Sequence, residues 1–165
     1  MFKFNNYMYI WLFIMLFNLS AFAQAESSAI KNLSQKADVI VTGKVTEKES
    51  SWNASKTRIY TKTTIQVDEY LKGTSNENTV QITSRGGEVG DVGELYTHMP
   101  RFDNDEEVLV FLKRDGSSTE YKVLNGEEGK ISVIEDPNTR EKVTHSSVRV
   151  KDLKSQIRNY VKDQQ

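Results

Sequence analysis

Residues 58–71, with the sequence RIYTKTTIQVDEYL, decide the fold class of this chain. Apolar and β-branched side chains recur at every second position, and charged or amide side chains mostly fill the positions between them. This two-residue period is typical of a strand with one buried face, because successive side chains of a strand point to opposite faces. We therefore expect a long antiparallel strand. The positions expected to face the core are Ile59, Thr61, Thr63, Ile65, Val67 and Leu71.

Segments with strand character lie on both sides of this stretch. Residues 108–112 (VLVFL) are apolar on both faces and predict the most central strand. Residues 38–47 alternate, and Gly43 within them predicts a bulge. Many short strands separated by turn residues such as Asp115-Gly116 predict a mainly β barrel or sandwich. The further predicted strands are 79–84, 94–99, 107–114, 121–124, 130–134 and 141–144.

Helices are predicted on both sides of these strands. Residues 26–36 place apolar side chains at helical spacing, which predicts a short N-terminal helix. Near the C-terminus, Val150, Leu153 and Ile157 form an apolar stripe beside lysines and an arginine. This pattern predicts an amphipathic helix that packs on the barrel, with Ser146 or Ser147 as its N-cap.

The first 23 residues have the features of a secretory signal peptide. Lys3 supplies a positive charge, residues 7–17 are apolar throughout, and small residues at 21–25 suit a signal peptidase. The apolar run is about half of the roughly 20 residues that a membrane-spanning helix needs. We therefore expect cleavage, no stable membrane anchor afterwards, and a secreted or periplasmic protein in which residues 24–165 form a single domain.

Charge and cysteine content restrict the classes of partner. The chain has no cysteine, so it forms neither a disulfide nor a lipid-modified N-terminal cysteine. Without the leader it has 21 basic and 23 acidic side chains, which are interspersed along the sequence. Because no basic stripe is present to neutralise phosphates, we expect no nucleic-acid partner. No cofactor-binding motif occurs, so we expect no cofactor.

Four motifs resemble those of a known group of proteins. They are ADVIVTGKV (37–45), VDEYLKG (67–73), GGEVG (86–90) and EEVLVFL (106–112). In this order they resemble short exported bacterial proteins with an OB-type barrel similar to that of netrin-like modules and tissue inhibitors of metalloproteinases. The resemblance covers about residues 35–134. It implies a small OB-like antiparallel barrel, here flanked by the two predicted helices.

Two departures limit what the resemblance implies. The metalloproteinase inhibitors bind the zinc of their target through an N-terminal cysteine, and this chain has none. Asp103, Asn104 and Asp105 occupy a turn in which the bacterial group usually has glycine. The resemblance therefore implies a fold and an exported location, but no reaction.

Two loops contain the candidate ligand contacts. Trp52 lies in the polar connection ESSWNAS, where a tryptophan either packs back on the core or contacts a ligand. In barrels of this type the loop between the first two strands borders the binding face. In the aperiodic stretch 85–106, Gly86 and Gly87 would let a ligand approach the backbone, and Arg85 would meet an anion. Bends between strands are the other use of these glycines.

Three acidic residues are the candidate metal ligands. Asp103, Asp105 and Glu107 alternate like the oxygen ligands of some calcium loops. The glycine and the distal glutamate of an EF-hand are missing, so a solvated acidic turn is the favoured interpretation. His98 and His145 lie 47 residues apart and belong to no zinc motif.

No catalytic motif, such as a G-x-S-x-G turn, is present. We therefore expect a non-enzymatic binding or interaction domain, with an extracellular or periplasmic protein as its partner. Two alternatives remain open. An envelope hydrolase or metal-dependent enzyme would use the acidic turn and the histidines, and a protease-inhibitor-like module would follow from fold analogy alone.

Overall fold

The computed structural model describes residues 27–74, 77–116 and 120–163. The chain divides between Asn32 and Leu33 into two units, and every contact described below lies within the second. Residues 27–36 form a helix across this division, which confirms the predicted N-terminal helix. The predicted signal peptide lies outside the described residues.

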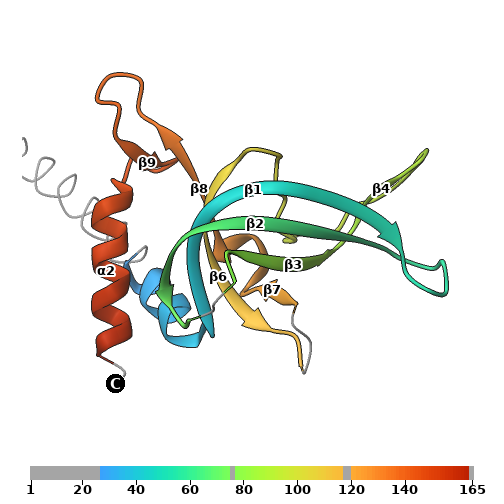
Figure 1. Ribbon diagram of the computed structural model, residues 1–165, viewed down its shortest axis with the longest axis horizontal. Helices are drawn as coiled ribbons and strands as arrows, with labels where there is room; N and C mark the ends of the chain where they lie inside the picture. The colour runs from blue at the N-terminus through green and yellow to red at the C-terminus, as the bar shows by residue number, and fades with distance from the viewer. Residues whose placement is uncertain (1–26, 75–76, 117–119, 164–165) are drawn as a thin grey trace, which may run out of the picture. The chain divides into compact units, whose positions relative to one another are not determined.

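A closed barrel is built from five strands (Figure 1): β1 (Val39–Trp52), β2 (Ile59–Lys72), β3 (Thr79–Arg85), β6 (Glu107–Arg114) and β7 (Tyr121–Val123). They neighbour one another in the order β1-β2-β3-β7-β6, and β6 pairs back with β1. All these pairs are antiparallel except β3–β7, which is parallel and consists of Ile82 opposite Tyr121. The predicted mainly β, OB-like barrel is thus confirmed.

The Glu120 carboxylate strengthens this short β3–β7 contact. Glu120 precedes β7, and one of its oxygens accepts a hydrogen bond of 2.5 Å from the Thr83 hydroxyl on β3. Its other oxygen lies 2.5 Å from the Lys62 ammonium on β2. Side chains therefore join β7 to two strands with which its backbone shares little or no pairing.

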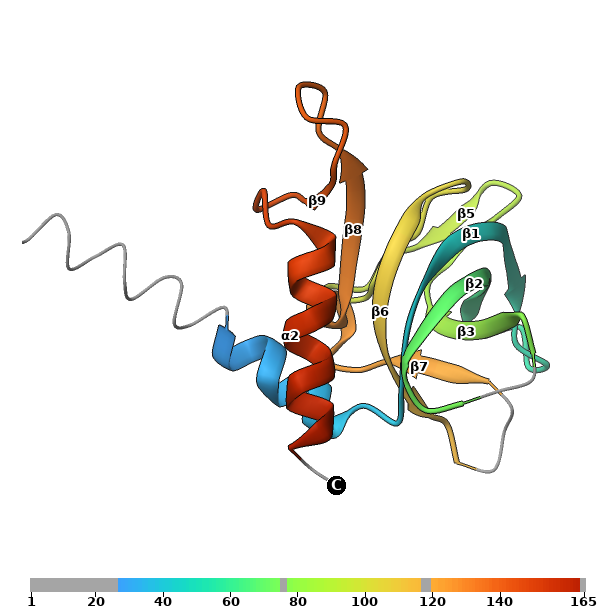
Figure 2. The same cartoon turned by 60° about the vertical axis from the view of Figure 1, so that its left-hand side comes forward.

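The remaining elements extend the barrel. They are the hairpin of β4 (Gly87–Val89) and β5 (Val92–Glu94), the 3-10 turn η1 (Gly126–Gly129), β8 (Lys130–Glu135), β9 (Lys142–Thr144) and α2 (Val150–Lys162). β8 pairs with β6, and β9 pairs with β8. Figure 2 shows α2 alongside β8 and the barrel.

The predicted alternation fills the barrel interior. In β2 the predicted core positions are buried, apart from Val67, which is half-buried. β6 is buried at all five positions from 108 to 112, as expected for the central strand. The largest apolar cluster consists of Val39, Val41, Val45, Ile65, Val80, Ile82, Phe102, Val108, Val110 and Leu112.

The amphipathic helix α2 packs as its stripe predicts. Val150, Leu153 and Ile157 are buried, and Ile157 has no exposed surface. The ammonium of Lys154 lies 3.1 Å from the carboxylate of Glu69 on β2, and Arg158 pairs with the other oxygen of the same carboxylate. Among the described residues, no helix has the length and apolar content needed to cross a membrane.

Gly43 forms the predicted irregularity in β1. The pairing of β1 with β2 shifts register between Thr42 and Gly43. A Cβ atom at position 43 would lie 2.2 Å from the carbonyl oxygen of Gln66 and 2.8 Å from Cγ2 of Ile65. The two strands therefore approach too closely here for any side chain.

The prediction of a strand at residues 94–99 is wrong. β5 ends at Glu94, whose carboxylate accepts hydrogen bonds from the backbone N–H of Ile59 at 3.1 Å and the hydroxyl of Tyr96 at 3.2 Å. His98 then adopts a φ of 64°, a left-handed conformation that no strand contains. Side-chain anchoring and this turn replace the extended backbone.

The predicted cap of α2 is also wrong. The N-cap is Arg149, without a capping side chain, and the helix begins at Val150. Ser147 instead lies in a turn with a φ of 61°, and its N–H donates to the carbonyl of Thr144 at 2.8 Å. The Thr144 hydroxyl accepts a hydrogen bond of 3.2 Å from the Val148 N–H, so this turn is completed before the helix starts.

Candidate functional site

The β1–β2 end of the barrel carries the residues predicted to contact a ligand. Trp52 is opposite Ile59, and Tyr60 is opposite Arg85. Directly opposed residues share a face of an antiparallel sheet, whereas neighbours along a strand point to opposite faces. Trp52 therefore lies on the face of the fully buried Ile59 and is half-buried, whereas Arg85 is exposed on the other face. The fold brings the two residues to one end but not to one surface.

Gly86 and Gly87 bring the β4–β5 hairpin close to β1 and β2. The Gly86 N–H donates to the carbonyl of Ile59 at 2.9 Å. A Cβ atom on Gly87, whose φ is 134°, would lie 2.3 Å from the Thr61 hydroxyl and 2.4 Å from the Ser50 hydroxyl. Both glycines therefore allow close backbone packing, and their contact with a ligand stays a prediction.

The β4–β5 hairpin instead presents apolar side chains. Val92 is 47% exposed and Leu95 is 74% exposed. In the described part of the chain, Ile134 is the only other large hydrophobic side chain classed as exposed, at 43%. The carboxylate of Glu94 accepts a hydrogen bond from Ile59 of β2, and Ile59 is paired with Trp52 of β1. Val92 and Leu95 therefore lie at the same end of the barrel as Trp52. We call Trp52, Val92 and Leu95 the distal surface.

The acidic candidates are divided among different lysines. The Asp105 carboxylate lies 2.6 Å from the ammonium of Lys44, and that of Glu107 lies 2.6 Å from the ammonium of Lys142. The backbone of Asp103 takes part in the turn to Glu106. No group of three or more potential metal-ligating side chains occurs within the described ranges, which include both histidines.

Glu106 is the centre of a largely buried polar cluster. Its carboxylate accepts hydrogen bonds from the Ser132 hydroxyl at 2.6 Å and the Asp103 N–H at 3.0 Å, and pairs with the Lys130 ammonium at 2.6 Å. Lys130 also donates to the carbonyl of Arg101 at 2.6 Å. Burial alone would raise the pKa of Glu106, but these partners outweigh it, so the pKa lies below its usual value. The cluster fastens the loop before β6 to β8.

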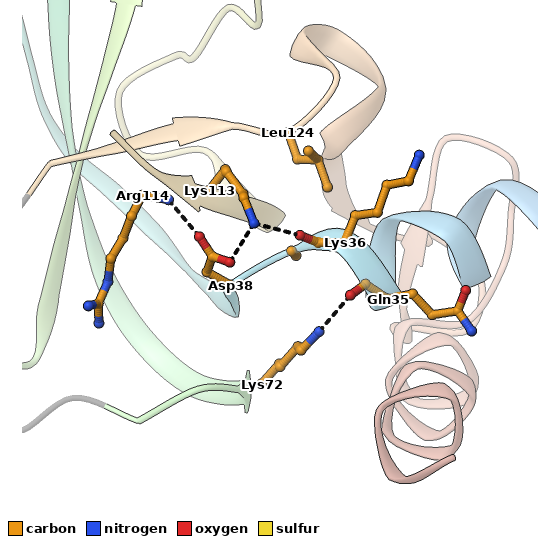
Figure 3. A pocket seen from close by; sticks show the side chains of 8 residues that line it. Gln35, Lys36, Asp38, Lys72, Lys113, Arg114 and Leu124 are labelled. Carbon is orange, nitrogen blue, oxygen red and sulfur yellow. Dashed lines mark hydrogen bonds and ion pairs between the residues drawn. The ribbon is translucent and has the colours of Figure 1, made fainter. Parts of the chain in front are cut away.

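A basic pocket lies at the opposite end of β2 (Figure 3). It is an open depression of about 800 Å³, lined by Gln35, Lys36, Ala37, Asp38, Lys72, Lys113, Arg114 and Leu124. The residues come from the end of the N-terminal helix, the start of β1, the C-terminal ends of β2 and β6, and the position after β7. Sequence reasoning missed this pocket because its cations are far apart in the chain. Basic residues at the ends of two predicted strands were the only available signal.

Internal hydrogen bonds fix the positions of two pocket lysines. Lys72 donates to the carbonyls of Ser34 at 2.8 Å and Gln35 at 3.0 Å, at the C-terminal end of the helix. Lys113 donates to the carboxylate of Asp38 at 2.7 Å and to the carbonyl of Lys36 at 3.3 Å. These carbonyls carry the negative partial charge of a helix C-terminus, which favours nearby cations.

The same arrangement shifts two pKa values. Hydrogen bonds from Lys113 and from the Arg114 backbone N–H hold the pKa of Asp38 below its usual value. Burial lowers the pKa of Lys72, and the nearby charge of Lys113 lowers it further, against an opposing effect of Asp38. The lowered pKa of Lys72 therefore reflects its burial, because the attraction of Asp38 outweighs the repulsion of Lys113.

Comparison of the chain with models of known protein families and with curated proteins gives no match. The assignment of function therefore rests on the geometry described above.

Proposed function

We propose that this chain is an exported, non-enzymatic binding domain whose distal surface contacts an extracellular or periplasmic protein. The observation that supports the proposal most directly is the exposure of Val92 and Leu95 at the end of the barrel that also carries the half-buried Trp52. A single exposed apolar side chain on a soluble domain needs no explanation, but neighbouring ones that a fold leaves uncovered are typical of interaction sites.

The distal surface also has the energetic features of a contact site. Full burial of a leucine or valine side chain contributes about 1.5–3 kcal/mol, and tryptophan is enriched among the residues that dominate protein interfaces. The Gly86 and Glu94 hydrogen bonds to Ile59 hold the hairpin in place before any partner arrives. Less conformational entropy is then lost on binding.

Site-specific photo-crosslinking in the exporting cell tests this function. A benzophenone side chain is placed at Leu95 in one preparation and at Ile134, an exposed apolar position on β8, in a matched control. We expect a discrete protein adduct from position 95 and none from position 134. Trp52→Ala in the position-95 protein should abolish or strongly reduce the adduct.

Three results would argue against the proposal. They are equal adducts from both positions, no adduct from position 95, and an adduct that Trp52→Ala leaves unchanged. The mass of the adduct identifies the partner, and twice the mass of the chain would show self-association instead of a second protein.

The alternative functions receive no support from this geometry. Asp105 and Glu107, which a metal-dependent enzyme would use, pair with separate lysines. The protease-inhibitor-like module stays a prediction from fold analogy.

A further inference from the structure

The basic pocket contains more positive charge than its own residues neutralise. Lys36, Lys72, Lys113 and Arg114 line it, and Asp38 is its single carboxylate. This is an excess of three positive charges in a protein whose formal net charge is −1. A cluster of cations in a depression attracts counter-ions and favours anionic ligands.

The four cations fall into two kinds. Lys72 and Lys113 are held by helix carbonyls and by Asp38, so their ammonium groups are fixed before a ligand arrives. Lys36 and Arg114 differ from them. Within the described residues, neither the Lys36 ammonium nor the Arg114 guanidinium forms a hydrogen bond or ion pair. Both side chains are exposed, and Figure 3 shows them pointing away from each other, on either side of Asp38 and Lys113.

We propose that this pocket binds a small anion that carries carboxylate or phosphate groups. The planar guanidinium of Arg114 suits bidentate hydrogen bonding to either group, and the ammonium of Lys36 adds a second mobile donor. Leu124 supplies apolar surface for the rest of the ligand.

This site is separate from the distal surface. Lys72 ends β2, and Ile59, the partner of Trp52, begins it. A strand of 14 residues spans about 45 Å at a rise of about 3.3 Å per residue. The anion site therefore does not depend on the proposed protein contact.

A purely structural role for the cluster predicts a different result. If the lysines only anchor the end of the helix, removal of the Lys36 and Arg114 charges changes no ligand affinity. The test is a titration of the exported protein with inorganic phosphate and, separately, with citrate. It is followed by the backbone amide chemical shifts of residues 35–38, 72 and 113–114, with sodium chloride at matched ionic strength as the reference.

We expect saturable shifts with a dissociation constant of about 1 mM or tighter for at least one probe. The double variant Lys36→Gln/Arg114→Gln should weaken binding at least tenfold. The control Arg140→Gln/Lys151→Gln removes the same charge from two exposed ion pairs outside the pocket and should leave binding within twofold.

Several results would overturn the proposal. They are shifts that chloride reproduces, shifts that do not saturate, and equal weakening in both double variants, which would indicate general screening. Vesicles of phosphatidylglycerol and phosphatidylcholine form a separate arm. Binding to these vesicles without any response to free phosphate or citrate would assign the pocket to a lipid headgroup and exclude a small soluble ligand.

Discussion

Substitution of Gly43 by alanine tests the close approach of β1 and β2 that shapes the barrel. The new Cβ would lie 2.2 Å from the Gln66 carbonyl oxygen, about 1 Å inside an ordinary contact. Because the obstacle is backbone, the strands must separate at the register shift. Overpacking of this kind costs about 1–3 kcal/mol. The loss of unfolded-chain entropy on replacing glycine by alanine offsets about 0.4–1 kcal/mol of this cost.

We therefore expect Gly43→Ala to lower the free energy of unfolding by about 1–2 kcal/mol. Urea unfolding followed by circular dichroism measures this difference. With a slope of about 2 kcal/mol per molar urea, the midpoint should fall by about 0.5–1 M at an unchanged slope.

Gly93→Ala is the matched control for this substitution. Its Cβ would meet Cγ of Glu88 at 3.5 Å, an ordinary contact, and neither Gly43 nor Gly93 has a positive φ. The control should be neutral or slightly stabilising. Equal midpoints for the two variants would refute the argument that the β1–β2 approach excludes a side chain at position 43.

Three further predictions concern other parts of the molecule. Glu106→Gln should destabilise the fold by about 1.5–3 kcal/mol, because it leaves the mostly buried Lys130 without its counter-charge. Urea unfolding measures this loss, with the exposed Glu127→Gln as the control variant. The pKa values of Glu106 and Asp38 are lower in the folded state, so their stabilising contribution is complete above their unfolded pKa values near 4.5 and 3.8. This contribution should be lost as the pH falls through the folded-state pKa values. Thermal unfolding between about pH 6 and 2 measures the loss. Leu95→Ser should change the unfolding free energy by less than about 0.5 kcal/mol, because the side chain is 74% exposed; a larger loss would mean that Leu95 is part of the core.

The barrel was predictable where side-chain period and burial agree. β2 and β6 appeared in the sequence because half-buried strands alternate and doubly buried strands are continuously apolar. β1 was predicted only to residue 47, because residues 47–52 (EKESSW) are mostly polar. Pairing with β2 extends the strand to Trp52, and no local sequence preference reports such pairing.

The candidate site was less predictable, since its residues meet only after folding. Trp52 and Arg85 were both predicted as ligand contacts from their loops, and strand pairing places them on opposite faces. Leu95 follows Glu94, whose carboxylate accepts a hydrogen bond from the N–H of Ile59, 35 residues earlier in the chain. Local sequence does not report such a distant contact. The basic pocket likewise joins positions 36, 72 and 113–114.

The unequal pairing around the barrel has a consequence for how it opens. β1 and β6 pair over six positions, whereas the described residues of β3 and β7 pair at one, reinforced by the Glu120 carboxylate. Local unfolding starts where the fewest contacts must break. On its other side β7 pairs with β6 at only three positions, so amide protons of Tyr121–Val123 should exchange with solvent through partial opening before those of β1. The hydrogen bonds from Lys62 and Thr83 hold the pKa of Glu120 below its usual value, so this side of the barrel should loosen further only in acid strong enough to protonate that carboxylate.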